Sequence, residues 1–303
     1  MYHIILNPAA GHGRSVAILP QLTTHLAAHC VPFETLPTAA PGAAREIAAK
    51  ACRDGSDGII GIGGDGTLQE IVTGMRDAHP DAGIIPTPLG VLPCGSGNDF
   101  SLTFEGKKKT KSEERIRSLT ASVADGQTIP VDLINISGGQ ICMNIANMGL
   151  DARIVQNAES YKQRFGGNAY LAASYKSISQ HKNIKMTIEA DDEIFAGDFT
   201  LAAVCNGQYY GGGLRISPRA RLNDGLITLC IVDKLSRAKT SILFPSVLFE
   251  RHVNLKEVHY VTCKRVKITA DETEILCVDG NLYGHPGTLE FNMLPGAIRM
   301  FAP

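Results

Sequence analysis

The first 125 residues alternate short apolar strands with helices, and this alternation limits the possible folds more than any other feature of the sequence. Short apolar strands separated by helices are typical of a doubly wound sheet whose strands run mainly parallel. Such sheets bind ligands beyond the carboxyl ends of their strands. We expect strands at His3–Asn7, Phe33–Leu36, Gly58–Ile62 and Leu89–Pro93, and helices at Ser15–His29, Pro41–Ala51, Thr67–Asp77 and Ser112–Ala124.

After about residue 126 the pattern changes to a series of strands. Two helices interrupt the series, one near Asn168–His181 and one near Ser236–Glu250, which Pro245 must break or kink. The sequence therefore predicts an α/β domain at residues 1–126 and an antiparallel β-sandwich at 127–303. The last strand is a candidate to pack back on the first domain. Strands are expected at Ile129–Ile136, Gln140–Asn147, Ile184–Ala190, Phe199–Cys205, Leu226–Val232, Arg265–Ala270, Ile275–Val278 and Thr288–Phe291.

The composition indicates a cytoplasmic protein without a strong electrostatic field. The 29 basic and 30 acidic residues give a net charge of −1, which argues against nucleic acid as a partner. The eight cysteines occur singly, and most of them lie within or beside apolar runs, as expected in a reducing compartment. No apolar stretch approaches the roughly 20 residues that span a bilayer, so we expect a soluble or peripheral protein.

Two glycine-rich turns follow two of the predicted strands. Glycine lets the backbone adopt positive φ and lets N–H groups approach a phosphate closely. An acidic residue in such a turn repels phosphate unless a metal ion or a transferable proton lies between them. Nucleotide phosphates with Mg²⁺ are therefore the first hypothesis. The turns are Gly63-Gly64-Asp65-Gly66-Thr67 and Gly95-Ser96-Gly97-Asn98-Asp99.

The residues of these turns allow more than one role. Thr67 is expected to cap the following helix, whose amino end favours phosphate. Asp65 either orients metal-bound phosphate and takes part in proton transfer, or merely caps a helix. Ser96 is a possible hydroxyl donor to phosphate, whereas Asn98-Asp99 either faces the nucleotide or forms an Asx turn that starts a helix.

A third turn follows the first predicted strand. Its sequence predicts a phosphate-facing loop in which Arg14 supplies the positive charge. Many first strands end in an Asn-Pro turn without any ligand, so this turn gains weight as the third glycine loop at one edge of the sheet. It reads Asn7-Pro8-Ala9-Ala10-Gly11-His12-Gly13-Arg14.

The order of the three turns resembles the catalytic domain family of diacylglycerol kinases, which includes bacterial soluble lipid kinases, sphingosine kinases and ceramide kinases. The resemblance continues through the second half, so that it covers nearly the whole chain. The matching segments there are Asn144–Ala152, Tyr161-Lys162, Gly166-Gly167, Tyr170-Leu171, Asn206-Gly207, Gly211–Gly213, Ser217-Pro218 and Asn223–Leu226.

The resemblance implies that ATP binds between the two domains and that its γ-phosphoryl group passes to a hydroxyl of diacylglycerol or a related lipid. Asp151 would face a polar group of the substrate, with a loop-capping role as the alternative. Together with the chemistry of the turns, the resemblance gives a set of residues for the nucleotide. They are Asn7, Pro8, Gly11, Gly13, Arg14, Thr38, Gly63, Gly64, Asp65, Gly66, Thr67, Gln69, Gly95, Ser96, Asn98 and Asp99.

The resemblance also implies a structural Mg²⁺ held by the carboxylate of Asp224 and the backbone carbonyls of Arg221 and Leu226. Ligands that are all oxygen suit Mg²⁺. Without the resemblance, Asp224-Gly225 would be read as a hairpin turn between strands.

One departure from the family pattern concerns catalysis. Members usually carry Asp-Gly-Glu near the C-terminus, with the glutamate as the proposed general base, whereas this chain has Asp279-Gly280-Asn281. An amide cannot accept the proton, and a general base typically contributes ~10²–10⁴-fold. Transfer could use Asp279 or Asp65 as the base, could depend on positioning and charge stabilisation, or could be weak. We expect an active enzyme that uses Asp279 or Asp65. At position 69, glutamine replaces the usual asparagine.

Two other functions remain as alternatives: an NAD kinase, which shares the GGDG turn, and a nucleotide-binding regulatory protein that has lost activity with Asn281. The apolar stretch Ser241–Phe249 is either core or a lip that takes up acyl chains from a membrane. The Lys107–Lys109 run is either a solvated loop or a contact for anionic lipid headgroups. His252 is expected at the surface or in a loop, and a homodimer is possible through exposed sandwich edges.

Overall fold

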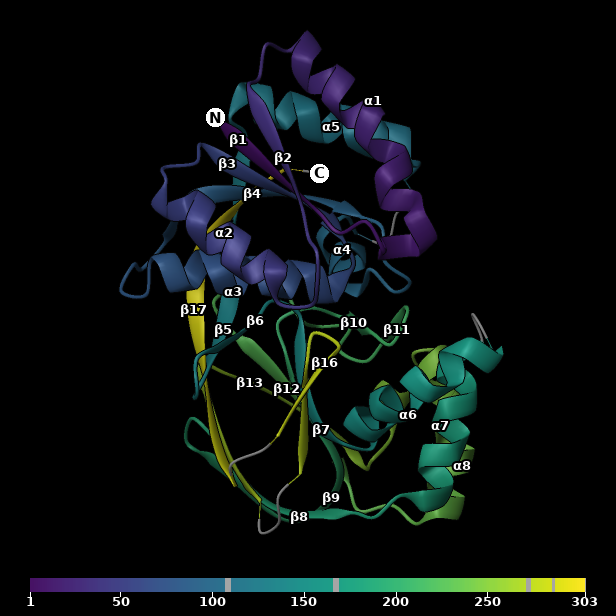
Figure 1. The fold of residues 1–303 in the computed structure, drawn as a ribbon. Coiled ribbons are helices and arrows are strands. Elements are labelled where there is room, and N and C mark those ends of the chain that lie inside the picture. The colour runs from purple at the N-terminus through teal and green to yellow at the C-terminus, as the bar shows by residue number, and fades with distance from the viewer. Residues whose placement is uncertain (107–109, 166–168, 271–273, 285–286, 303) are drawn as a thin grey trace. The chain divides into compact units, whose positions relative to one another are not determined.

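The computed structural model describes residues 1–106, 110–165, 169–270, 274–284 and 287–302. The chain forms two compact units (Figure 1). The first unit comprises Met1–Leu133, Leu222–Asp224 and Leu294–Pro303, and the second comprises Ile134–Arg221 and Gly225–Met293. The Lys107–Lys109 run and the Gly166-Gly167 pair lie outside the described residues.

The first unit is built on a parallel sheet with the strand order β2-β1-β3-β4. The end of β17 continues this sheet, since Ile298 and Met300 pair in parallel with β4. The predicted doubly wound, mainly parallel sheet is confirmed. The strands are β1 (Tyr2–Leu6), β2 (Phe33–Pro37), β3 (Gly58–Gly63), β4 (Ile85–Pro93) and β17 (Thr288–Phe301).

Helices cover both faces of this sheet, with α1 and α5 on one face and α2 and α3 on the other (Figure 1). Leu22 and Leu26 of α1 and Ile116 of α5 are fully buried in one core cluster with Ile4 and Ile60 of the sheet. The helices are η1 (Ala10–Gly13), α1 (Arg14–Ala28), α2 (Ala43–Arg53), α3 (Asp65–Ala78), α4 (Asp99–Phe104) and α5 (Ser112–Asp125).

The second unit is a β-sandwich-like domain of antiparallel strands. The first half of β9 pairs with β8, and its second half lies between β7 and β12, so β9 connects two groups of strands. Side chains such as Ile188, Val204 and Leu229 from these strands share one buried cluster. The strands are β5 (Thr128–Ile136), β6 (Gln140–Cys142), β7 (Ile145–Gly149), β8 (Ile184–Ala190), β9 (Glu193–Cys205), β10 (Tyr209–Tyr210), β11 (Leu214–Arg215), β12 (Ile227–Asp233), β13 (Val258–Cys263), β14 (Arg265–Ala270), β15 (Ile275–Val278) and β16 (Asn281–Gly284).

The helices of the second unit differ from the prediction in number. The expected helix near 168–181 is α7, but a further helix, α6, precedes it and begins directly after β7. Pro245 does divide the expected helix near 236–250, because it starts α9 as its first residue. The helices are α6 (Leu150–Phe165), α7 (Ala169–Gln180), α8 (Arg237–Leu243), α9 (Pro245–Leu248) and η3 (Arg251–Asn254).

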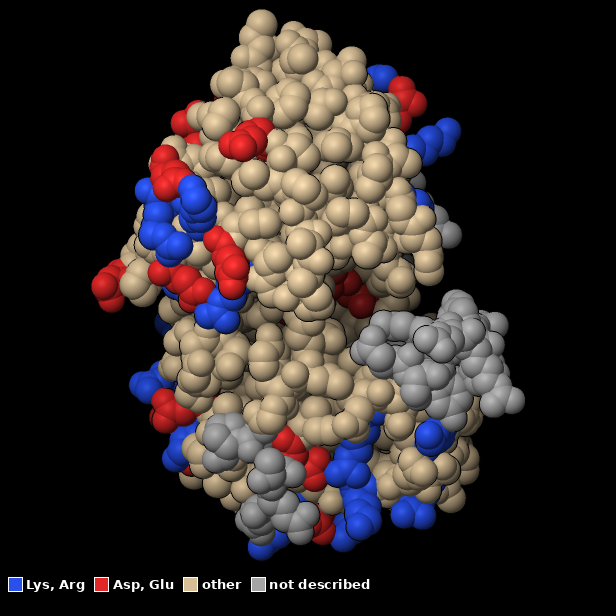
Figure 2. Space-filling view, in the orientation of Figure 1, with Lys and Arg blue, Asp and Glu red and all other residues tan. Residues whose placement is uncertain are grey.

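Along α2 and α3, on the face seen in Figure 2, positively and negatively charged side chains lie next to one another. Several form ion pairs, such as Arg45 with Asp77 at 2.6 Å and Lys50 with Asp54. In the described part of the chain, no helix is both long enough and apolar enough to cross a bilayer.

Candidate functional site

The first unit brings the three glycine turns into contact with one another. A Cβ atom on Gly95 would lie 2.6 Å from the Cα of Gly64, and one on Gly11 would lie 2.2 Å from the carbonyl oxygen of Cys94. Both distances are far below van der Waals contact. Only glycine therefore fits at these positions, and the close approach of three bare backbones explains why the sequence repeats it.

Polar side chains hold the first turn against the other two. The amide of Asn7 donates to the hydroxyl of Thr67 at 2.9 Å. Arg14 donates to the carbonyl of Gly11 at 3.1 Å and to the carbonyl of Gly95 at 3.1 Å. The guanidinium thus bridges two of the turns at an exposed position, where it keeps its positive charge beside the bare backbone.

Asp65 joins the two acidic turns. Its carboxylate accepts the backbone N–H of Asp99 at 3.1 Å and that of Phe100 at 3.0 Å, at the first residues of α4. Burial raises the pKa of Asp65, and the N–H donors partly oppose that shift. A Cβ on Gly97 would lie 3.1 Å from a carboxylate oxygen of Asp99 and 3.4 Å from one of Asp65, so the two carboxylates approach the same point.

Two predicted roles need correction. Thr67 does not cap α3, because that helix begins at Asp65 with Gly64 as its N-cap, and Thr67 lies within the first turn. The side chain of Gln69 is 3% exposed and donates to Thr73 at 3.2 Å, so it is part of the packing of α3. As predicted for Asn98-Asp99, α4 starts directly after Asn98, but the Asn98 side chain makes no capping bond to that helix and instead accepts from the backbone N–H of Gly95 at 2.7 Å.

The remaining predicted nucleotide residues lie at or near the ends of the parallel strands. Thr38 follows β2 and donates its N–H to Leu6 at 2.8 Å. Ser96 is exposed, and Pro8 and Gly66 are half-buried. At Gly13, φ is +87° and a Cβ would meet nothing within 4 Å, so bare backbone faces open space. Bare glycine backbone, the positive amino end of α3 and the Arg14 guanidinium together favour a bound anion such as phosphate.

In the second unit, the carboxylate of Asp279 is fully engaged by the backbone. One oxygen accepts the N–H groups of Asn144 at 3.0 Å and Ile145 at 2.9 Å, and the other accepts that of Met143 at 2.8 Å. These residues form the turn that splits the predicted strand 140–147 into β6 and β7. Burial raises the pKa of Asp279 to about 6 against the lowering effect of its donors. The contacts give Asp279 a structural role, and its predicted role as a base gains no support from them.

Asn281 starts β16 in the same hairpin. It pairs with Val278 of β15 and is half-buried. The expected glutamate position is therefore part of the β-ladder, on an edge of the sandwich-like domain.

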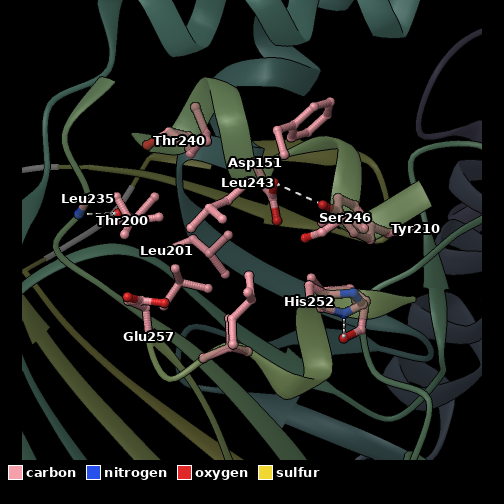
Figure 3. Close-up of a pocket in the computed structure, with 17 residues that line it drawn as sticks. Asp151, Thr200, Leu201, Tyr210, Leu235, Thr240, Leu243, Ser246, His252 and Glu257 are labelled. Carbon is pink, nitrogen blue, oxygen red and sulfur yellow. Dashed lines mark hydrogen bonds between the residues drawn. The ribbon is translucent and has the colours of Figure 1, made fainter. Parts of the chain in front are cut away.

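Asp151 lines a mostly apolar pocket in the second unit, and Figure 3 shows it beside Tyr210 and Ser246. It is 1% exposed, and one of its carboxylate oxygens accepts the hydroxyl of Tyr210 at 3.0 Å. Burial raises the pKa of Asp151 to about 7, while the Tyr210 hydroxyl opposes that shift. An acidic group at the end of an apolar pocket suits a ligand with a long apolar part and a polar end. The apolar lining includes Leu150, Leu201, Leu235, Leu243, Phe244 and Val247.

Sequence reasoning missed the other polar residues of this pocket. Tyr210, Ser246 and His252 all contribute to its lining. His252 was expected at the surface, but it is 3% exposed and contacts the carbonyl of Ile216 at 3.0 Å. No local pattern marks these residues, because they come from β10, α9 and η3, which meet only in the folded unit.

The predicted Mg²⁺ ligands lie in the loop before β12. Asp224 and Arg221 are exposed, and Leu226 is half-buried. Among the described residues, no group of three or more His, Cys, Asp or Glu could hold a metal ion. That search does not cover the predicted site, which has one carboxylate and two carbonyls. A donor set made only of oxygen remains compatible with Mg²⁺.

Family models match almost the whole chain. Residues 1–136 match the diacylglycerol kinase catalytic domain, and residues 144–302 match the YegS C-terminal NAD kinase beta sandwich-like domain. Among curated relatives, the diacylglycerol kinase of Bacillus subtilis (strain 168) is 29% identical, over 97% of this chain and 91% of its own. The diacylglycerol kinase of Mycobacterium tuberculosis (strain H37Rv) is 27% identical, over 99% of this chain and 94% of its own.

Solved structures show the same fold. A crystal structure of a Bacillus anthracis protein described as a diacylglycerol kinase has a TM-score of 0.72 at 20% identity, over 100% of this chain and 96% of the other. A second crystal structure from that organism has a TM-score of 0.80 at 23% identity, over 100% of this chain and 97% of the other.

Proposed function

We propose that this chain transfers the γ-phosphoryl group of ATP to a hydroxyl of diacylglycerol or a related lipid, with Mg²⁺. The chain belongs to the diacylglycerol kinase family and is a lipid kinase with an alcohol acceptor. The observation that carries the proposal is the buried carboxylate of Asp151 in the lining of a mostly apolar pocket. A lipid would place its chain along the leucines of the pocket and its hydroxyl at the carboxylate. NAD kinase shares the GGDG turn and gives its name to the sandwich-like domain, but the curated relatives that match nearly the whole chain are diacylglycerol kinases, so we favour the lipid as acceptor.

The nucleotide half of the reaction is assigned to the three turns of the first unit. Backbone N–H groups of Gly11, Gly13 and Gly66 and the side chains of Arg14 and Ser96 would contact the phosphates, and Thr38 and Asn7 would border the nucleotide. Gln69 is left out of this set because Thr73 occupies its side chain. Bound anionic oxygens would be stabilised by preorganised donors, which is the main contribution that phosphoryl transfer asks of a protein.

The proposed structural Mg²⁺ would be held by Asp224 with the carbonyls of Arg221 and Leu226. When bound, it would supply positive charge and fix the loop that carries these oxygens. The carboxylates of Asp65 and Asp99, which approach one point near Gly97, would orient metal-bound phosphate at that end of the nucleotide.

Asp65 is the better candidate for the general base. The carboxylate of Asp279 accepts three backbone N–H groups and the thiol of Cys142, whereas Asp65 lies in a glycine turn assigned to the nucleotide and accepts the N–H groups of Asp99 and Phe100. Burial raises the pKa of both carboxyl groups, so we choose Asp65 for its place among the phosphate-facing turns.

The central experiment uses the purified full chain with radiolabelled ATP, Mg²⁺ and mixed micelles that contain diacylglycerol. Labelled phospholipid is the expected product, and Asp65→Asn and Asp151→Asn should each reduce kcat/KM for lipid by about 100-fold. Asp81→Asn, on an exposed loop, serves as the matched control. Full activity of Asp65→Asn would remove its role, and phosphorylation of NAD without any lipid product would replace the proposal by the NAD kinase alternative.

Asn281 favours a second candidate, a nucleotide-binding regulatory protein with weak activity. The two functions separate in the variant Asn281→Glu. If only the base is missing, this change should raise turnover by at least about tenfold, since a positioned base is worth ~10²–10⁴-fold. Unchanged turnover in a chain that already phosphorylates lipid would support Asp65 as the base.

We further place the protein in the cytoplasm, at the periphery of a membrane that it contacts through α8 and α9. Residues 240–249 contain no charged residue, and Ile242, Leu248 and Phe249 are 75%, 51% and 72% exposed. The opposite side of these helices lines the lipid pocket through Leu243, Phe244 and Val247. Exposed apolar side chains next to a lipid pocket are suited to a bilayer surface.

Vesicle sedimentation tests the membrane contact. Phe249→Ser should weaken binding to phosphatidylglycerol-containing vesicles by about tenfold, since burial of a large apolar side chain contributes roughly 1.5–3 kcal/mol. Ile194→Ser, which changes a side chain that is 70% exposed on β9, is the control. Equal losses for both variants would contradict a specific role of α8 and α9.

A further inference from the structure

Three buried polar atoms of the lipid pocket lack a hydrogen-bond partner within the described part of the chain. They are one carboxylate oxygen of Asp151, the hydroxyl of Ser246 and the Nδ1 atom of His252. A buried polar group without a partner costs roughly 1–3 kcal/mol. Three such atoms around one pocket indicate that its natural occupant brings polar groups of its own.

The other polar side chains of the pocket are already paired. Thr200 donates to the carbonyl of Asp233 at 2.8 Å, and Thr240 donates to that of Ser236 at 3.0 Å. Glu257 accepts from Lys239 at 2.6 Å. The unmet hydrogen-bonding capacity is therefore concentrated at Asp151, Ser246 and His252. In the view of Figure 3, Ser246 and His252 lie to the right of the pocket, opposite Leu235, Leu201 and Glu257.

The surroundings of His252 fix which hydrogen bond it can make. Its Nε2 atom lies 3.0 Å from the carbonyl oxygen of Ile216, which also accepts the hydroxyl of Tyr260 at 2.5 Å. A carbonyl oxygen only accepts, so Nε2 carries the proton. In the neutral imidazole, Nδ1 is then an acceptor that needs a donor from the ligand.

We propose that Ser246 and His252 form a second polar subsite, which binds a second hydrogen-bond donor of the lipid, a hydroxyl or an amide N–H. This inference rests on the proposed function for the identification of the ligand as a lipid. Asp151 takes the first hydroxyl, and Nδ1 of His252 accepts from the second donor while the Ser246 hydroxyl pairs with the same group. Among the related lipids, the preferred substrate class is therefore a single-chain or amide-linked lipid with two donors at its polar end, such as a monoacylglycerol, which should bind more tightly than diacylglycerol with its one hydroxyl.

A site built to bind a hydroxyl discriminates against an analogue that lacks it, because its own polar groups then stay unpaired. The two matched probes are 1-octanoylglycerol, which has two hydroxyls, and 3-hydroxypropyl octanoate, which lacks only the second one. Calorimetric titration of the full chain below the micelle concentration of each probe should show about tenfold tighter binding of 1-octanoylglycerol, as expected for one buried hydrogen bond.

Two variants assign this preference to the subsite. Ser246→Ala removes a hydroxyl that has no bond to lose, and His252→Gln keeps an N–H for Ile216 while removing Nδ1. Each should reduce the tenfold preference to about twofold, whereas Ser241→Ala on the exposed side of α8 should leave it unchanged. Circular dichroism tests whether each variant is folded. If His252→Gln does not fold, the preference measured for Ser246→Ala alone tests the subsite.

Equal binding of the two probes by the wild-type chain, or a preference that survives in Ser246→Ala, would overturn the subsite. A kinase assay with the same probes separates this outcome from failure of the proposed function. Phosphorylation of both probes with the same preference in all variants would remove the subsite alone. Selective binding that depends on Ser246, without phosphorylation, would retain the subsite and remove the proposed kinase reaction.

Discussion

The turns of the first unit and the pocket of the second treat their polar groups in opposite ways. In the turns, Asp65 and Arg14 bond to backbone groups of neighbouring turns and Asn98 closes its own turn onto Gly95, so the loops are held in place. In the pocket, Asp151, Ser246 and His252 keep atoms without partners in the described part of the chain. The glycine turns are therefore preorganised around bare backbone, whereas the pocket keeps polar atoms without a hydrogen-bond partner that a ligand could bind.

This difference has a physical basis in what each region binds. A phosphate group is a compact, highly charged ligand that many N–H donors can share, so rigid backbone serves it well. A lipid offers few polar atoms on a large apolar body. Recognition of such a ligand depends on a small number of side chains whose partners are missing until it binds.

The largest effect is expected from breaking the contact between the turns. Gly95→Val would place its side chain on the Cα of Gly64, where no flexible atom can yield. Such overpacking costs typically 1–3 kcal/mol, so ATP affinity measured by equilibrium dialysis should fall by up to about 100-fold. Gly83→Ala, where a Cβ would meet nothing within 4 Å, is the control. Binding of 1-octanoylglycerol should persist, and its loss would show that the two regions are not independent.

A smaller effect is expected at the carboxylate of Asp279, both oxygens of which accept backbone N–H groups. In Asp279→Asn, an oxygen directed at Asn144 and Ile145 would leave the NH₂ group facing the N–H of Met143. We expect the free energy of unfolding in urea to fall by about 2 kcal/mol. A variant of unchanged stability that has lost kinase activity would instead identify Asp279 as catalytic.

The smallest effect is expected at the carboxylate of Asp151, one oxygen of which has no partner within the described residues. Here we expect the substitution to increase the free energy of unfolding. The folded-state pKa of Asp151 is raised from 3.8 to about 7, so the folded chain binds more protons than the unfolded chain in that window and loses stability as pH rises through it. Asp151→Asn removes the buried charge. At pH 8 it should be more stable than wild type by about 1 kcal/mol, and the difference should vanish near pH 4. A loss of stability at pH 8 would mean that the carboxylate has a partner in solution.

Much of the first unit could be predicted from the sequence, because its signals are local. The positions of the strands follow from short apolar runs, and the contact between turns follows from glycine at Gly64 and Gly95. The position of Thr67 was wrong because Asp65 already extends α3 by two residues. The pocket could be predicted only at Asp151, through the family resemblance, and as one of two readings of the apolar stretch Ser241–Phe249. Ser246 and His252 lie on short helical segments, and an unpartnered atom has no signature along the chain.

The path of the chain between its units has a consequence for inheritance and for protein engineering. β17 pairs with β14 through Thr288–Asn292 and then with β4 through Ile298 and Met300, so residues near 300 complete the sheet that residues 2–6 begin. A fragment that ends at Leu133 would lack this strand and expose the edge of β4, which favours aggregation. A single crossover between two relatives within the second unit would therefore pair β4 of one protein with β17 of the other. We expect the two units to be exchanged together rather than separately.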